Sequence, residues 1–258
     1  MEDYGLFKDL IYKKSGVDLS AYKEKQMKRR IETLAARRGF SKLIDYFACL
    51  NKDDRLYSEF IDFITINVSE FFRNPGQWDV LKNEIIPDLL KGKRSLKVWS
   101  CACSTGEEPY SMVMLLNSFM RPEDIKVLAT DIDEGAMEKA KEGIYKESSL
   151  KNMPPGLIKR YFTFAEDRYR ISDEIKKRVV FKKLDLLKDK FPSFCDLILC
   201  RNVLIYFTEQ TKQQLYVKFS GALDHQGVLF VGSTEQIVQP QIYNFLPIRA
   251  FFYRKVIK

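Results

Sequence analysis

The spacing of apolar residues divides the chain into a first part with helical periodicity and a later part with short apolar runs. Up to about residue 75 no run suits a strand, so this part is predicted to be all helical. One helix is predicted to begin at the N-cap Ser20 and to end before Gly39, and a second to span Ser41 to about Leu50. A third helical stretch, YSEFIDFITIN, has its apolar residues Phe60, Phe63 and Ile64 on one face.

From Leu96 onward, short apolar runs alternate with helical segments, a pattern typical of βαβ units and a mostly parallel sheet. The runs are LKVWSCA, KVLAT, CDLILC, GVLFVG and AFFYRKV. Because no long helix separates the last two, they are predicted to pair antiparallel. A segment of short alternating pieces between Tyr161 and Leu184 predicts a small β insertion.

The 258 residues exceed what one small core needs, which favours two units. We predict a helical domain at 1–75 and an α/β domain at 76–258, with a β-subdomain at about 160–184. At 45% hydrophobic and 30% charged, the composition is that of an ordinary globular protein. No stretch suits a membrane span and the start does not resemble a signal peptide, so a cytoplasmic protein is expected.

Cysteine and histidine usage bears on metal binding. The five cysteines form no CxxC pair and are interpreted as buried thiols, and His225 is the single histidine. No metal is therefore expected.

The formal net charge of +8 suggests an anionic partner. Much of the excess lies at 21–38, where seven lysines and arginines against two glutamates make a net charge of +5. Such a helix is either a solvated face or a docking surface.

The first apolar run, LKVWSCA, is followed by a tight loop at Ser104–Gly106 and by a helix that starts at Glu107. Nucleotide-binding loops, helix caps and plain turns share this pattern, so alone it is not specific. Asp131 follows Gly106 by 25 residues, near the spacing at which an acid bonds a ribose hydroxyl. The alternative for Asp131 and Asp133 is a helix cap plus a solvated acid. The acids at the helix start, Glu107 and Glu108, would repel a pyrophosphate but suit a sulfonium and an amine.

A further strand, CDLILC, is followed by Arg201, Asn202 and Tyr206. Taken singly, Asn202 suits a turn cap and Tyr206 a core aromatic. Because the carboxyl ends of parallel strands meet at one edge of a sheet, three such polar ends predict a ligand crevice.

Long motifs in the chain resemble the chemotaxis receptor methyltransferases, the CheR family. The matching strings are INVSEFFRN at 66–74, WSCACSTGEEPYS at 99–111, ATDIDEGAMEKAKEGIY at 129–145, CRNVLIYF at 200–207 and GVLFVGSTEQI at 227–237. In the last string this chain has GSTE where relatives often have GHSE, and no role is assigned to that loop.

The resemblance implies an all-α N-terminal domain followed by an α/β, Rossmann-like methyltransferase domain with a small β-subdomain. It implies S-adenosylmethionine as methyl donor and S-adenosylhomocysteine as product. The implied cofactor contacts are Asn67, Ser69, Arg73, Glu107, Asp131, Asp185, Leu186, Asn202 and Val203. The implied reaction is esterification of receptor glutamates, with Arg73 and Tyr206 beside the transferred methyl; the alternative for Arg73 is a salt bridge between the domains.

The expected partner is the helical cytoplasmic region of chemotaxis receptors, whose acidic surface a basic helix could dock. The candidate docking residues are Lys28, Arg29, Arg30, Arg37 and Arg38. Some relatives also grip a receptor C-terminal pentapeptide through a longer, glycine-containing loop; TFAEDRYR is short and lacks glycine, so no tether is expected.

Two other functions share these features. A nucleic-acid methyltransferase would tolerate the positive charge, but RNVLIYF stands where an amino-methylating enzyme would have an NPPY-like turn, and no nucleic acid is expected. A sensor of S-adenosylmethionine without catalysis is the second alternative.

Overall fold

The computed structural model describes residues 3–65 and 67–256. The chain forms two compact units, which are described separately. The first runs to Asn67 and includes Ile205–Gln214; the second comprises Val68–Leu204 and the chain from Leu215 onward. The predicted division at residue 75 stays a prediction.

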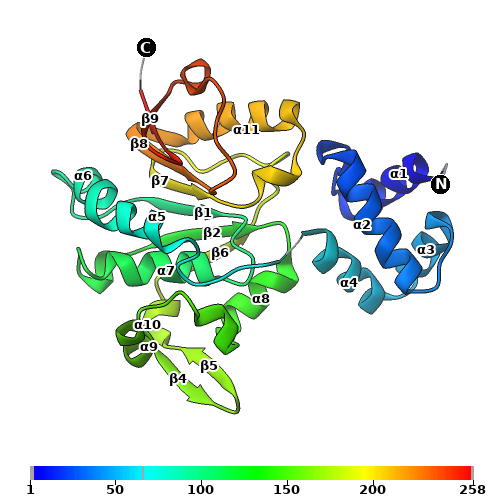
Figure 1. The fold of residues 1–258 in the computed structure, drawn as a ribbon, viewed down its shortest axis with the longest axis horizontal. Helices are drawn as coiled ribbons and strands as arrows, with labels where there is room; N and C mark the ends of the chain where they lie inside the picture. Colours follow the sequence, from blue (N-terminus) through cyan, green and yellow to red (C-terminus); the bar gives the residue numbers. More distant parts are fainter. Residues whose placement is uncertain (1–2, 66, 257–258) are drawn as a thin grey trace. The chain divides into compact units, whose positions relative to one another are not determined.

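The first unit is helical in its described part (Figure 1). Its helices are α1 (Tyr4–Ser15), the 3₁₀ turn η1 (Leu19–Ala21), α2 (Glu24–Arg37), α3 (Leu43–Leu50), α4 (Asp54–Thr65) and the first residues of α11 (Glu209–Ala222). Aromatic side chains fill its core, with Phe7 and Phe60 edge to face at 5.9 Å. Of the residues predicted to share a face of α4, Phe60 and Ile64 are buried and Phe63 is half-buried.

The predicted N-cap at Ser20 is wrong. The carboxylate of Asp18 accepts hydrogen bonds from the backbone N–H and the hydroxyl of Ser20, which closes the turn η1 instead. Helix α2 begins later, after Lys23. Gly39 follows its last residues with a positive φ of 85°, as predicted for the end of the helix.

The second unit is built on a seven-stranded sheet of order β6-β2-β1-β7-β8-β10-β9 (Figure 1). Its strands are β1 (Val98–Cys101), β2 (Val127–Asp131), β6 (Val179–Lys183), β7 (Cys195–Cys200), β8 (Leu223–Val231), β9 (Phe245–Arg249) and β10 (Phe252–Lys255). The strands from β6 to β8 are parallel, and β10 pairs antiparallel with β8 and β9. The mostly parallel sheet and its antiparallel end are confirmed.

Helices cover both faces of this sheet, because successive residues of a strand point to opposite sides. Val98 faces a cluster that includes Val113 of α7, whereas Trp99 contacts Phe219 of α11. The helical segments of this unit are α5 (Pro75–Val80), the π-helix η2 (Leu81–Ile85), α6 (Ile86–Leu89), α7 (Glu107–Leu116), η3 (Pro122–Asp124), α8 (Glu134–Glu142), η4 (Glu147–Leu150), α9 (Pro155–Tyr161), α10 (Asp173–Lys176), η5 (Leu204–Tyr206, shared with the first unit), the rest of α11, and η6 (Pro240–Tyr243).

A second, three-stranded sheet has the order β3-β5-β4, with β3 at Ile144–Tyr145, β4 at Phe162–Ala165 and β5 at Arg168–Ile171. The segment expected as a β insertion therefore contributes β4 and β5 to the small sheet but β6 to the large one. The reason is the apolar start of β6, where Val179 and Val180 pair in parallel with β2.

Within the described residues, no helix has the length and apolar character needed to cross a bilayer.

Candidate active site

The loop between β1 and α7 is tightly constrained. Ala102, Ser104 and Gly106 all have positive φ, and Gly106 reaches 91°. A Cβ at Gly106 would lie 2.8 Å from the Cβ of Ala140 and 3.0 Å from the ring of Tyr110, so only glycine fits. The loop therefore places the start of α7 at the carboxyl edge of the sheet, next to the end of β1.

Glu107, the first residue of α7, is 3% exposed. Its carboxylate accepts a 2.7 Å hydrogen bond from the hydroxyl of Thr105 and further bonds from Ser69 and Ser149. Burial raises the pKa of Glu107, and these hydrogen bonds oppose the rise. Two predicted site residues, Ser69 and Glu107, are thus in direct contact.

Asp131 ends β2 and is 6% exposed, so it is not the solvated acid of the alternative interpretation. Its carboxylate accepts backbone hydrogen bonds from Ser104 at 2.7 Å and from Asp133 at 2.9 Å. Burial raises the pKa of Asp131 to about 6. The cap role belongs to Asp133, which accepts from the N–H of Ala136 in α8.

The chain leaves β7 through Arg201 and Asn202. Asn202 has a φ of 61°, the left-handed region, and its N–H donates to Glu235 at 2.7 Å. Val203 follows it and is half-buried.

Arg201 is 6% exposed and connects several segments. Its Nη1 donates to Glu108 at 3.2 Å, and its Nη2 donates to the carbonyl of Arg73 at 2.7 Å and to the side chains of Asn74 and Gln77. The guanidinium also lies over the ring of Phe230, 4.6 Å from its centroid. Arg201 therefore holds the backbone of Arg73 against the end of β7.

Arg73 itself is half-buried. Its Nη1 donates to the carbonyl of Val68 at 3.1 Å, and its carbonyl accepts from Trp78 Nε1 at 3.0 Å. Its neighbours Phe72 and Asn74 both have positive φ, so the backbone turns sharply on either side of it.

Asp185 and Leu186 follow β6. One carboxylate oxygen of Asp185 accepts from the N–H of Leu187 at 2.8 Å, and the carbonyl of Leu186 accepts from Lys218 at 2.6 Å. This turn stands after the strand next to β2, and thus at the same sheet edge as Asp131.

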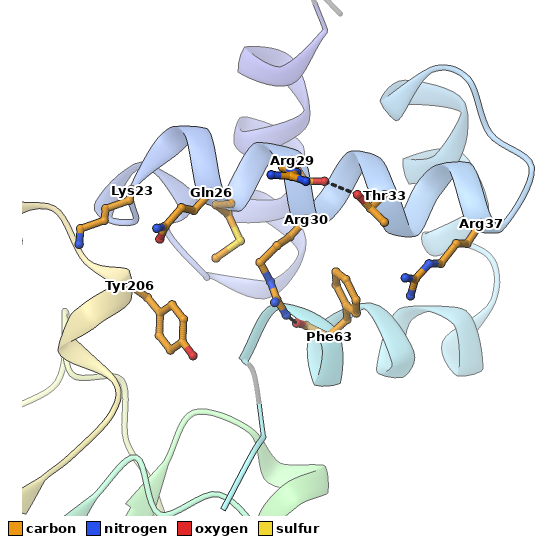
Figure 2. Close-up of a pocket in the computed structure, with 9 residues that line it drawn as sticks. Lys23, Gln26, Arg29, Arg30, Thr33, Arg37, Phe63 and Tyr206 are labelled. Carbon is orange, nitrogen blue, oxygen red and sulfur yellow. Dashed lines mark hydrogen bonds between the residues drawn. The ribbon is translucent and has the colours of Figure 1, made fainter. Parts of the chain in front are cut away.

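Asn67 and Tyr206 belong to the first unit. Asn67 Nδ2 donates to the hydroxyl of Thr65 at 3.1 Å. Tyr206 lines a hollow of about 540 Å³ beside α2 (Figure 2). The remaining predicted cofactor contacts belong to the second unit.

The hollow beside α2 is strongly basic (Figure 2). Its lining consists of Lys23, Gln26, Met27, Arg29, Arg30, Thr33, Arg37, Phe63 and Tyr206. Of the predicted docking residues, Arg29, Arg30 and Arg37 line it, and Arg30 donates to the carbonyl of Phe63. The other two differ: Lys28 lies over the ring of Tyr4, and Arg38 forms an ion pair with Glu59.

No group of three or more His, Cys, Asp or Glu arranged to hold a metal ion occurs among the described residues. The cysteines are free, and Cys101, Cys103, Cys195 and Cys200 are buried while Cys49 is half-buried. The acids that gather at the sheet edge, Glu107 and Asp131, suit an amine, a sulfonium and ribose hydroxyls, so the donor set fits S-adenosylmethionine.

Sequence reasoning missed Ser100 and Glu235 as members of the site, and it grouped Glu108 with Glu107 as an acid suited to a cationic ligand. Ser100 donates to Glu108 at 2.8 Å, and Glu108 pairs with Arg201. Glu235 lies in the GSTE loop, where the only signal was an acid three residues after a glycine that follows a strand.

Comparison with known proteins gives the family. Residues 2–65 match the CheR methyltransferase all-alpha domain, and residues 67–252 match the CheR methyltransferase SAM binding domain. A chemotaxis protein methyltransferase of Listeria innocua is 41% identical over 255 residues, covering 98% of this chain and 97% of that protein. One of Borreliella burgdorferi is 36% identical, covering 88% and 86%. The chain therefore belongs to the CheR family of S-adenosylmethionine-dependent chemotaxis methyltransferases.

Proposed function

We propose that this enzyme esterifies glutamate side chains of chemotaxis receptors to glutamyl methyl esters, for sensory adaptation. The observation that carries the substrate class is the basic hollow beside α2, where Arg29, Arg30 and Arg37 surround a space that Tyr206 also lines. Clustered cations of this kind favour an anionic partner, which an acidic protein surface would provide. The names of the relatives, chemotaxis protein methyltransferases, support the same class.

The proposed cofactor site is the carboxyl edge of the large sheet. Glu107 and Ser69 would hold the charged amino-acid end, and Asp131 the ribose hydroxyls. Asp185 with Leu186 and Asn202 with Val203 would line the rest, together with Asn67 and Arg73. S-adenosylmethionine supplies a methyl group on a sulfonium, and S-adenosylhomocysteine is the product.

The proposed chemistry requires no general base. A glutamate side chain has an ordinary pKa near about 4.3, so at neutral pH the substrate is already a carboxylate nucleophile. Most of the barrier reduction then comes from orienting the reactants and excluding water. Arg73 would orient the substrate carboxylate, and the Tyr206 hydroxyl would donate a hydrogen bond to it.

The proposed partner is the helical cytoplasmic region of the receptors. We expect the enzyme to act in the cytoplasm without inserting into the membrane or binding nucleic acid. Strands β4 and β5 are joined by a two-residue turn of Glu166 and Asp167, both with positive φ and neither a glycine. This short turn supports independence from a receptor C-terminal pentapeptide; saturable, specific binding of that peptide would contradict it.

The test of the function is transfer of label from methyl-labelled S-adenosylmethionine to receptor-rich membranes, followed by mild alkali. Release of the label as volatile methanol is expected, because carboxyl methyl esters hydrolyse readily. Label that survives alkali would indicate N-methylation or nucleic acid as the substrate. No transfer would favour a sensor of the cofactor.

A further inference from the structure

The buried carboxylate of Glu235 connects the carboxyl ends of two neighbouring strands of the large sheet, β7 and β8. Glu235 follows β8, is 5% exposed, and stands 33 residues from Asn202 in sequence. Its Oε2 accepts from the N–H of Asn202 at 2.7 Å and from the N–H of Gly232 at 2.7 Å. One charged oxygen therefore holds the segment that leaves β7 and the segment that leaves β8.

The packing around this carboxylate admits no side chain at Gly232. A Cβ there would lie 2.4 Å from Glu235 Oε2, 2.9 Å from the backbone nitrogen of Asn202 and 3.1 Å from Asn202 Nδ2. The glycine thus permits both the carboxylate and the Asn202 amide to approach the backbone. This close approach belongs to the same packing that brings the two hydrogen bonds to one carboxylate oxygen.

Asn202 has a φ of 61°, in the left-handed region, which asparagine enters more readily than most other L-residues but still at some cost in free energy. A hydrogen bond from the Asn202 N–H to a buried carboxylate stabilises that conformation. The conformation in turn sets where the amide side chain points.

We propose that Glu235 is a positioning residue, which fixes the left-handed turn at Asn202 and so presents the Asn202 side chain to S-adenosylmethionine. The inference rests on the proposed function of Asn202 as a cofactor contact. It assigns a role to the GSTE loop, and it predicts that Glu235 acts on the cofactor through Asn202 alone.

The experiment measures the affinity of the full chain for S-adenosylhomocysteine by calorimetry, which needs no receptor. Glu235→Ala removes the acceptor from two backbone N–H groups and is expected to weaken binding by about tenfold or more. Glu235→Gln keeps a neutral acceptor, so a loss of only a few-fold is expected, and it serves if the alanine variant does not fold. Gln236→Ala, at an exposed neighbour, is the matched control with unchanged affinity.

A double-mutant cycle separates positioning from general stability. In an Asn202→Ala background, Glu235→Ala should lose most of its effect, because there is no amide left to position. In steady-state kinetics, Glu235→Ala should raise the KM for S-adenosylmethionine and leave the KM for the receptor unchanged.

These measurements distinguish the positioning role of Glu235 from the role of Asn202 as a cofactor contact. Additive losses in the cycle would overturn the positioning role while leaving Asn202 as a contact. No loss on Asn202→Ala alone would overturn the contact and with it the positioning role. Receptor methylation, measured separately with labelled cofactor, tests the proposed reaction independently of both.

Discussion

Arg201 and Glu108 form an ion pair inside the α/β unit, with 3.2 Å between Arg201 Nη1 and Glu108 Oε2. Their side chains are only 2% and 13% exposed. Burial raises the pKa of Glu108, and the positive charge of Arg201 opposes that rise. Because Arg201 also holds the carbonyl of Arg73, the pair connects the start of α7 to the loop that carries a proposed catalytic residue.

Replacing Arg201 by methionine should destabilise the fold strongly. Glu108 would keep a buried carboxylate without its cation, which costs about 3–5 kcal/mol in the free energy of unfolding. Urea unfolding measures the change. The matched control is Lys141→Met, which breaks the exposed pair with Glu138 and should cost less than about 1 kcal/mol. Equal effects of the two substitutions would contradict a structural role for the buried pair.

Affinity for S-adenosylhomocysteine should fall in mild acid. Asp131 has a pKa raised to about 6 by burial, so it is ionised at pH 7.5 but mostly protonated at pH 5. A protonated carboxyl accepts weaker hydrogen bonds from ribose hydroxyls, and the affinity should drop up to about tenfold over this range. The pKa of Glu107 is also raised by burial, so protonation of Glu107 in acid would weaken cofactor binding as well.

Calorimetry at several pH values measures this dependence. The Asp131→Asn variant should bind more weakly at pH 7.5 and show a flatter profile, because position 131 no longer titrates. A profile as steep as that of the unaltered chain would assign the titration to another group.

Removing the Tyr206 hydroxyl should slow the reaction without weakening cofactor binding. If the phenol donates a hydrogen bond in the transition state, Tyr206→Phe lowers kcat by about a hundredfold. Affinity for S-adenosylhomocysteine should change less than about twofold, because this hydrogen bond would form to the substrate carboxylate and not to the cofactor. Tyr12→Phe, at a half-exposed position of α1, is the control with unchanged kcat.

The basic hollow predicts unequal roles within the cationic helix α2. Arg29→Glu and Arg37→Glu, both at the hollow, should raise the KM for receptor by several-fold to about tenfold and reduce its salt dependence. Lys28→Glu should have a smaller effect, because Lys28 lies over the ring of Tyr4 instead. Equal effects at all three positions would indicate that net charge alone, and not the hollow, governs docking.

Local patterning determined much of the fold. Apolar runs predicted β1, β2, β7 and β8, because a buried parallel strand needs a nearly continuous apolar stretch, and a further run predicted the antiparallel β10. The same reasoning missed β9, which contains Pro247 and an exposed Leu246, and it left β6 outside the large sheet. Both strands lie at the edges of the sheet, where one side is less buried and the apolar signal is weaker.

Motif positions in the sequence also indicated which strand ends carry polar side chains, including Glu107, Asp131 and Asn202. Which of them touch was decided by the tertiary structure. The Glu235 carboxylate reaches the Asn202 N–H across 33 residues, and Arg201 reaches Glu108 across 93. Periodicity reports only how each element is buried, whereas such bonds depend on the strand order that places distant segments side by side. The sequence by itself therefore determined most of the elements and the family, and the fold decided which buried charges hold the candidate site in shape.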